Sequence, residues 1–154
     1  MQPDWRQRLT DVLVIGLIIL ALLGAAAPDY YRVRDVRASR DLLRQLNQAE
    51  QEFQTANPHL GYACTLDELS EAGLLAPTVT EGSTDSYFIQ LSCRGRRRLG
   101  PHSAYVLYLR PKYSDRPYLC SDESGLIAND RWSLMKCFES LRAQRSPAFD
   151  NALP

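Results

Sequence analysis

The stretch VLVIGLIILALLGAAAPDYYRVR, residues 12–34, places an apolar run without charges directly before a proline, two tyrosines and two arginines. The run itself, residues 12–27, rises about 24 Å as a helix at ~1.5 Å per residue. This is slightly less than a bilayer core usually requires, but Leu9 before it and Tyr30-Tyr31 after it extend its apolar reach. We therefore expect a single transmembrane helix.

A secretory signal peptide is the main alternative for this segment. Arg6 and Arg8 would form its basic start, residues 12–23 its apolar centre and residues 24–26 a cleavage motif of small side chains. Cleavage there would leave Pro28 at or beside the new terminus, which we expect to hinder a signal peptidase. The retained helix is therefore the favoured interpretation.

Beyond Pro28 the apolar residues recur every three, four or seven positions, which is the spacing of one helical face. This pattern predicts an amphipathic helix over residues 29–56, ending before Asn57-Pro58 because proline disfavours a helical residue in front of it. Since membrane helices tolerate proline as a kink, one helix from about residue 5 to 56, kinked at Pro28, is allowed. Its buried stripe is expected to comprise Val36, Leu42, Leu43, Leu46, Ala49 and Phe53.

The remainder predicts a small antiparallel sheet. Runs of aromatic and branched residues at 87–93, 104–110 and 117–121 predict three strands of a meander, with a fourth strand as an option. Thr65 and Glu68 form a capping-box pattern that starts a short helix ending near Gly73. The expected class is α+β, with a long N-terminal helix on a small meander. The expected divisions are 1–28 (cytoplasmic stub and transmembrane segment), 29–57 (amphipathic continuation), 58–145 (disulfide-bonded head) and 146–154 (flexible tail).

Charge and motifs argue against nucleic-acid binding and catalysis. The chain has 18 acidic and 18 basic residues, so no global field attracts an anionic partner. Arg94 and Arg96–Arg98 are grouped in one loop, but no aromatic residue lies among them to stack on bases. His59 and His102 show no pattern with a nucleophile. We therefore expect no enzyme activity, no cofactor and no small-molecule substrate.

The four cysteines are Cys64, Cys93, Cys120 and Cys137. They form no CxxC pair and no histidine stands at ligand spacing, so the sequence predicts two disulfides and no zinc site. Disulfides indicate an oxidising compartment. The acidic residues of segment 122–130 fit no EF-hand spacing, so no calcium site is expected either.

Three segments resemble a known family. "PDYYRVR" (28–34), "GYACTLDELSEAGLL" (61–75) and "YLCSDESGLI" (118–127) are similar to segments of type IV pilins and of the pseudopilins of type II secretion. The similarity covers most of residues 9–128. It implies a pilin-like fold, a single pass through the bacterial inner membrane, a periplasmic head and, for some members, an extracellular filament.

The resemblance also assigns roles to residues. Asp11 falls where the family carries a glutamate thought to pair with a neighbouring subunit's amine. The family's cleavage glycine has no counterpart before Gly16, so residues 1–8 are expected to stay attached and Arg6 or Arg8 to pair with Asp11. The alternative is that Asp11 lies at the lipid headgroups, partly solvated, with no role in assembly. Small residues allow close approach of neighbouring helices. The expected packing positions are Gly16, Ala21, Gly24 and Ala25.

Four cysteines allow three disulfide pairings. Cys93 shares a strand face with Tyr87, Ile89 and Leu91, which directs it toward the loop that carries Cys64, and the Cys120 to Cys137 spacing resembles the disulfide-closed C-terminal region of many type IV pilins. We therefore predict Cys64–Cys93 and Cys120–Cys137. If the C-terminal segment crosses back over the helix, Cys64–Cys137 and Cys93–Cys120 is the alternative.

These features together predict a structural protein. We expect a minor pilin or pseudopilin of a type IV filament or type II secretion-type apparatus, whose partners are other such subunits and the inner membrane. The alternative is a non-assembling binding module with a pilin-like head, either membrane-anchored or secreted to the periplasm.

Overall fold

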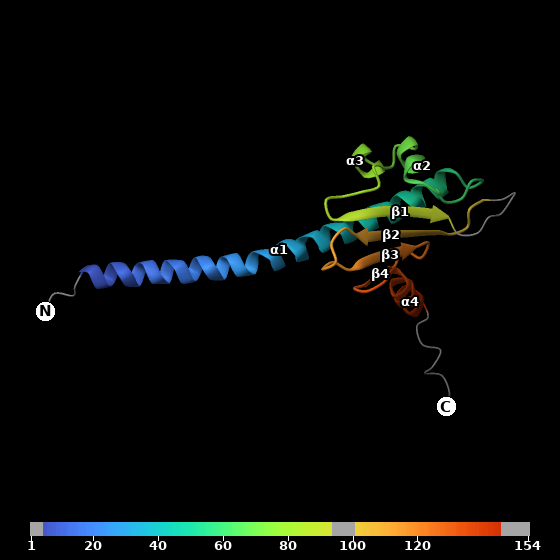
Figure 1. Cartoon of the computed structure of the whole chain (residues 1–154). Coiled ribbons are helices and arrows are strands. Elements are labelled where there is room, and N and C mark those ends of the chain that lie inside the picture. Colours follow the sequence, from blue (N-terminus) through green and yellow to red (C-terminus); the bar gives the residue numbers. More distant parts are fainter. Residues whose placement is uncertain (1–4, 94–100, 146–154) are drawn as a thin grey trace, which may run out of the picture. The chain divides into compact units, whose positions relative to one another are not determined.

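The computed structural model of the chain describes residues 5–93 and 101–145 (Figure 1). The chain divides into two compact units, Met1–Asp35 and Val36–Pro154. The described elements form an α+β fold, and all strands lie in the second unit. In chain order the elements are α1 (Trp5–Ala56), α2 (Leu66–Glu71), α3 (Pro77–Thr80), β1 (Tyr87–Cys93), β2 (Tyr105–Pro111), β3 (Tyr118–Asp122), β4 (Ile127–Asp130) and α4 (Leu134–Arg145).

The transmembrane part of the expected fold is wrong. Over residues 5–93 and 101–145, no helix combines the length and the apolar character needed to cross a membrane. The physical reason is the end of the apolar run at Pro28-Asp29: a rise of about 24 Å is shorter than the ~30 Å core of a bilayer. The pilin-like fold with a membrane-spanning first helix is therefore corrected. The single-pass placement in the inner membrane, which depended on that helix, is wrong as well.

Helix α1 is helical through Pro28 and ends at Ala56, as the sequence predicts. Its last turn is closed by Asn57, whose backbone N–H donates to the carbonyl of Phe53 at 2.9 Å. The side-chain amide of Asn57 donates to the same carbonyl at 3.1 Å. Pro58 follows at once, so the helix stops where its last carbonyls find a side-chain donor.

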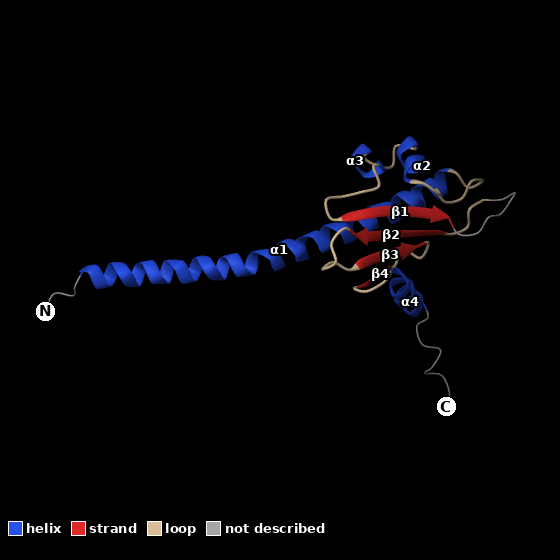
Figure 2. Cartoon of the chain, in the orientation of Figure 1, coloured by secondary structure: helices blue, strands red, loops and turns tan. Residues whose placement is uncertain are grey.

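The sheet is an antiparallel meander in the order β1-β2-β3-β4, and the optional fourth strand is present. Strand β1 has the predicted bounds, and β2 and β3 begin one residue later than predicted. In the register of β1 and β2, Tyr87 faces Pro111 and Cys93 faces Tyr105. Figure 2 shows the four strands side by side.

One face of the sheet forms the main core with the second part of α1. Alternate strand residues point to this face, as expected for a sheet with one buried side. Leu43 and Leu46 of α1 are fully buried against them, which confirms the amphipathic stripe. The strand residues of this cluster are Tyr87, Ile89, Tyr105, Leu107, Leu109 and Leu119.

Helix α4 packs on the other side of β3 and β4. Cys120 of β3 points away from its neighbour Leu119, and it clusters with Ala128, Cys137 and Leu141. Ser133 caps the start of this helix, because its hydroxyl accepts the N–H of Lys136 at 3.2 Å. In the turn before it, Asp130 accepts the backbone N–H groups of Trp132 and Ser133 at 2.7 and 2.9 Å. These bonds lower the pKa of Asp130.

The short helix α2 has the predicted capping box. The hydroxyl of Thr65 accepts the N–H of Glu68 at 3.2 Å, and the Glu68 carboxylate accepts the N–H of Thr65 at 3.1 Å. Leu69 of α2 is fully buried beside Ala49, Phe53 and Ala63. The segment after α1 is therefore attached to the helix by a second apolar cluster.

Candidate functional site

The first candidate site is the apolar segment of α1, in the first unit. Its large apolar side chains are exposed, from 51% for Val14 to 70% for Val12 and Leu20. Successive residues of a helix point about 100° apart, so a continuous apolar run covers every side of the helix. A patch of this kind requires cover by something else. The exposed residues are Val12, Leu13, Val14, Ile15, Leu17, Ile18, Ile19, Leu20 and Leu22.

The residues assigned to assembly lie along the same segment. Asp11, Gly16, Ala21 and Gly24 are exposed. A Cβ atom placed on Gly16 or Gly24 would meet nothing within 4 Å, so the space beside both glycines is open in a single chain. The side chains of Ala25 and of Pro28, the expected kink, lie outside the described residues.

The second unit contains a buried polar network that the sequence did not reveal. The hydroxyl of Tyr105 donates to the side-chain oxygen of Asn47 at 2.9 Å. The amide of Asn47 donates to the hydroxyl of Ser121 at 2.7 Å, and this hydroxyl donates to the carbonyl of Leu126 at 2.7 Å. The network links α1 to β2, β3 and the turn before β4, and so fixes the helix against the sheet.

Glu50 is a buried acid without a basic partner in the described contacts. Its side chain is fully buried, Oε2 accepts the N–H of Ala63 at 2.9 Å, and Oε1 has no hydrogen-bond partner among the described residues. Burial raises the pKa of Glu50 from 4.5 to about 8, so the carboxyl is protonated at neutral pH. Burial and the nearby Glu50 also raise the pKa of Tyr105.

Both predicted disulfides are confirmed. Cys64 is bonded to Cys93 and Cys120 to Cys137. Cys64 and Cys93 are half-buried, whereas Cys120 and Cys137 are fully buried in the α4 cluster. The two bonds therefore differ in their access to reagents.

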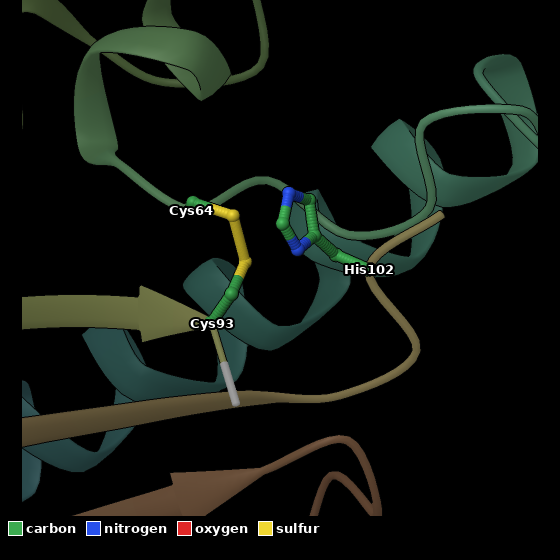
Figure 3. A group of neighbouring side chains, drawn as sticks. All are labelled: Cys64, Cys93 and His102. Carbon is green, nitrogen blue, oxygen red and sulfur yellow. A yellow bond between two sulfur atoms is a disulfide. The ribbon is translucent and has the colours of Figure 1, made fainter. Parts of the chain in front are cut away.

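His102 lies beside the first disulfide, a proximity that the sequence spacing did not predict. Its backbone forms a parallel bridge with Gly61, in the segment after α1. The N–H of His102 donates to the carbonyl of Leu60 at 2.7 Å, and the carbonyl of His102 accepts the N–H of Tyr62 at 3.0 Å. Three possible metal-ligand atoms lie within 4.8 Å of one another: the sulfur atoms of Cys64 and Cys93 and a ring nitrogen of His102 (Figure 3).

Gly61 makes this approach possible. Its φ angle is 83°, a conformation that side chains disfavour. A Cβ atom at this position would lie 2.2 Å from the carbonyl oxygen of His102. A glycine is therefore required for His102 to reach the disulfide.

The other residues considered from the sequence have separate environments. Asp122 is buried and pairs with Arg145 at 2.6 Å, and Glu123 pairs with the same arginine at 2.8 Å. His59 is exposed. The arginines of segment 94–98 lie outside the described residues.

In three comparisons with known proteins, no family model, no curated protein and no solved structure matches this chain.

Proposed function

We propose that this chain is a structural subunit that assembles through the apolar segment of α1, residues 12–22. The observation that carries the proposal is the exposure of large apolar side chains on every side of that segment. One partner covers only one side of a helix. Several neighbouring copies, or closely related subunits, are needed to cover all of it.

The kind of assembly is proposed from the sequence resemblance. Minor pilins and pseudopilins of type IV filaments and type II secretion are non-enzymatic subunits that assemble through an N-terminal apolar helix. The two disulfides support a working place in an oxidising compartment. In this proposal the second unit is presented on the assembly, and no catalytic step is assigned to it.

The local chemistry of the segment favours contact between like helices. Gly16 and Gly24 leave open space beside the helix, which permits close approach of a neighbouring backbone. Asp11 carries the opposite charge to Arg8 three positions earlier, and both side chains are exposed. A neighbour shifted along the helix axis can therefore place its arginine beside Asp11.

Sedimentation velocity of the full chain tests the proposal. We expect wild-type protein to form species larger than a dimer and Leu17→Glu to remain monomeric, because a charge cannot be buried without a partner. Gln45→Glu is the matched control, since residue 45 is an exposed position of the same helix in the second unit. The control is expected to assemble like wild type. Equal assembly of the two variants would contradict the proposal.

A second candidate is a secreted binding module that does not assemble. It is favoured by Trp132, just before α4, and by Met135 in its first turn, whose side chains are 74% and 76% exposed. Exposed aromatic and methionine side chains are enriched where proteins bind partners. A wild-type chain that stays monomeric at all concentrations tested would favour this candidate over the first.

A further inference from the structure

The side chains of Cys64, Cys93 and His102 converge from three separate segments. Cys64 precedes α2, Cys93 is the last residue of β1 and His102 lies shortly before β2. Figure 3 shows the imidazole ring turned toward the disulfide. Two sulfur atoms and one imidazole nitrogen are three of the four ligands of a common type of zinc site.

We propose that reduction of the Cys64–Cys93 disulfide creates a Zn²⁺ site formed by the two thiolates and the imidazole of His102, with water as the fourth ligand. While the disulfide is intact, neither sulfur carries the charge that a metal requires. The three side chains therefore cannot bind Zn²⁺ in oxidising surroundings, and they can bind it where thiol reductants are present.

The chemistry balances with a dithiol as the reductant. The sulfur–sulfur bond breaks, the two cysteines gain two electrons and two protons, and the dithiol is oxidised to its own disulfide. Zn²⁺ then displaces the two thiol protons and forms two Zn–S bonds and one bond to the neutral imidazole. No other oxidant or reductant is needed.

The distances suit a tetrahedral metal. Zn–S and Zn–N bonds of about 2.3 and 2.1 Å place neighbouring ligand atoms roughly 3.5–3.8 Å apart. The three candidate ligand atoms already lie within 4.8 Å of one another. Once the sulfurs are no longer bonded, rotation about the side-chain torsions is sufficient to let them separate and to bring the ring closer.

The backbone supports of the site do not depend on the disulfide. Cys93 is paired with Tyr105 in the β1–β2 ladder, and the N–H of Cys64 donates to the carboxylate of Glu68. The His102 backbone is held by its hydrogen bonds to Leu60 and Tyr62. We therefore expect the three side chains to remain together after reduction.

All three side chains are half-buried, so a metal ion and a reductant can reach them. The second disulfide is fully buried, and it can remain intact while the first is opened. This difference allows the site to be tested in the otherwise oxidised full chain.

Cobalt titration of the partly reduced full chain tests the proposal. Co²⁺ replaces Zn²⁺ in such sites, and tetrahedral thiolate coordination gives it visible absorption and a thiolate charge-transfer band. We expect one Co²⁺ per chain, displaced by Zn²⁺ and absent from the fully oxidised chain. His102→Ala should weaken cobalt binding by at least about tenfold, because one of three protein ligands is lost.

His59→Ala is the matched control, because His59 and His102 are the chain's two histidines and the exposed His59 is not part of the cluster of Cys64, Cys93 and His102. We expect this variant to bind Co²⁺ like wild type. Thermal unfolding gives a second readout, in which the same concentration of Zn²⁺ raises the melting temperature of the reduced wild type more than that of His102→Ala. Absence of the charge-transfer band, or equal affinities of the two histidine variants, would overturn the proposal.

Discussion

The amide of Asn47 donates a 2.7 Å hydrogen bond to the hydroxyl of Ser121, joining α1 to β3 across 74 positions of the sequence. Asn47 also accepts the hydroxyl proton of Tyr105. Replacing Asn47 with leucine removes the acceptor of the buried Tyr105 hydroxyl and a donor to the buried Ser121 hydroxyl. We expect Asn47→Leu to lower the free energy of unfolding by about 2–3 kcal/mol, measured by urea denaturation.

The adjacent residue supplies the control for this prediction. Gln48 is exposed and its amide donates to Glu52 on the helix surface. We expect Gln48→Leu to change the free energy of unfolding by no more than about 0.5 kcal/mol. Similar losses in both variants would show that the network has no special role in stability.

Stability should depend on pH through Glu50. Its pKa is raised from 4.5 to about 8 in the folded chain, so the folded state binds the extra proton between these values. The stabilisation is complete below pH 4.5 and is lost as the pH rises through about 8. In this window we expect the free energy of unfolding to fall by up to about 1.4 kcal/mol per pH unit.

Glu50→Gln isolates this effect. Glutamine keeps an oxygen acceptor for the N–H of Ala63 but has no proton to lose. We expect its free energy of unfolding, from urea midpoints across the same window, to vary less with pH than that of wild type. Parallel pH profiles of the two proteins would assign the dependence to other groups.

The two disulfides should react in a fixed order. We expect limited reduction followed by alkylation to label Cys64 and Cys93 first, because Cys120 and Cys137 are fully buried. Peptide mapping identifies the labelled residues. Loss of each crosslink is expected to lower the free energy of unfolding by roughly 3 kcal/mol in the chain-entropy account. Earlier labelling of Cys120 would be the contrary result.

Asp11 should contribute to assembly through its charge. In the proposed assembly it pairs with Arg6 or Arg8 of a neighbour, so Asp11→Asn is expected to lower the yield of crosslinked oligomers, with a smaller difference at high salt. Val12→Leu, which keeps the position apolar and uncharged, should leave the yield unchanged. Equal yields from the two variants would remove the assembly role of Asp11.

Much of the fold was predictable because its local signals agree. The alternating pattern from Tyr87 to Cys93 predicted β1, and Thr65 with Glu68 predicted the start of α2. Asn57-Pro58 predicted the end of α1. The transmembrane interpretation was wrong because the apolar run 12–27 is shorter than a bilayer core, and Leu9 and Tyr30-Tyr31 were counted to make up the missing length.

The polar interior could not be predicted in the same way. Glu50 lies on the helical face of Leu46 and Phe53, so the spacing contained a signal, but charged residues on helices usually face solvent. The proximity of His102 to the disulfide was not predicted, because metal-site motifs are recognised from ligands that are close in the sequence. Its position depends instead on a bridge to Gly61, 41 residues away in the sequence.

The contact between Gly61 and residue 102 has a consequence for evolution. A Cβ atom at position 61 would collide with the backbone of residue 102, which every amino acid has. Glycine is therefore needed at position 61 whatever side chain position 102 carries. Among descendants of this chain, we expect glycine to persist at position 61 for as long as the fold persists. A histidine at position 102 should be retained only in lineages that also keep both Cys64 and Cys93, if metal binding is what selection preserves.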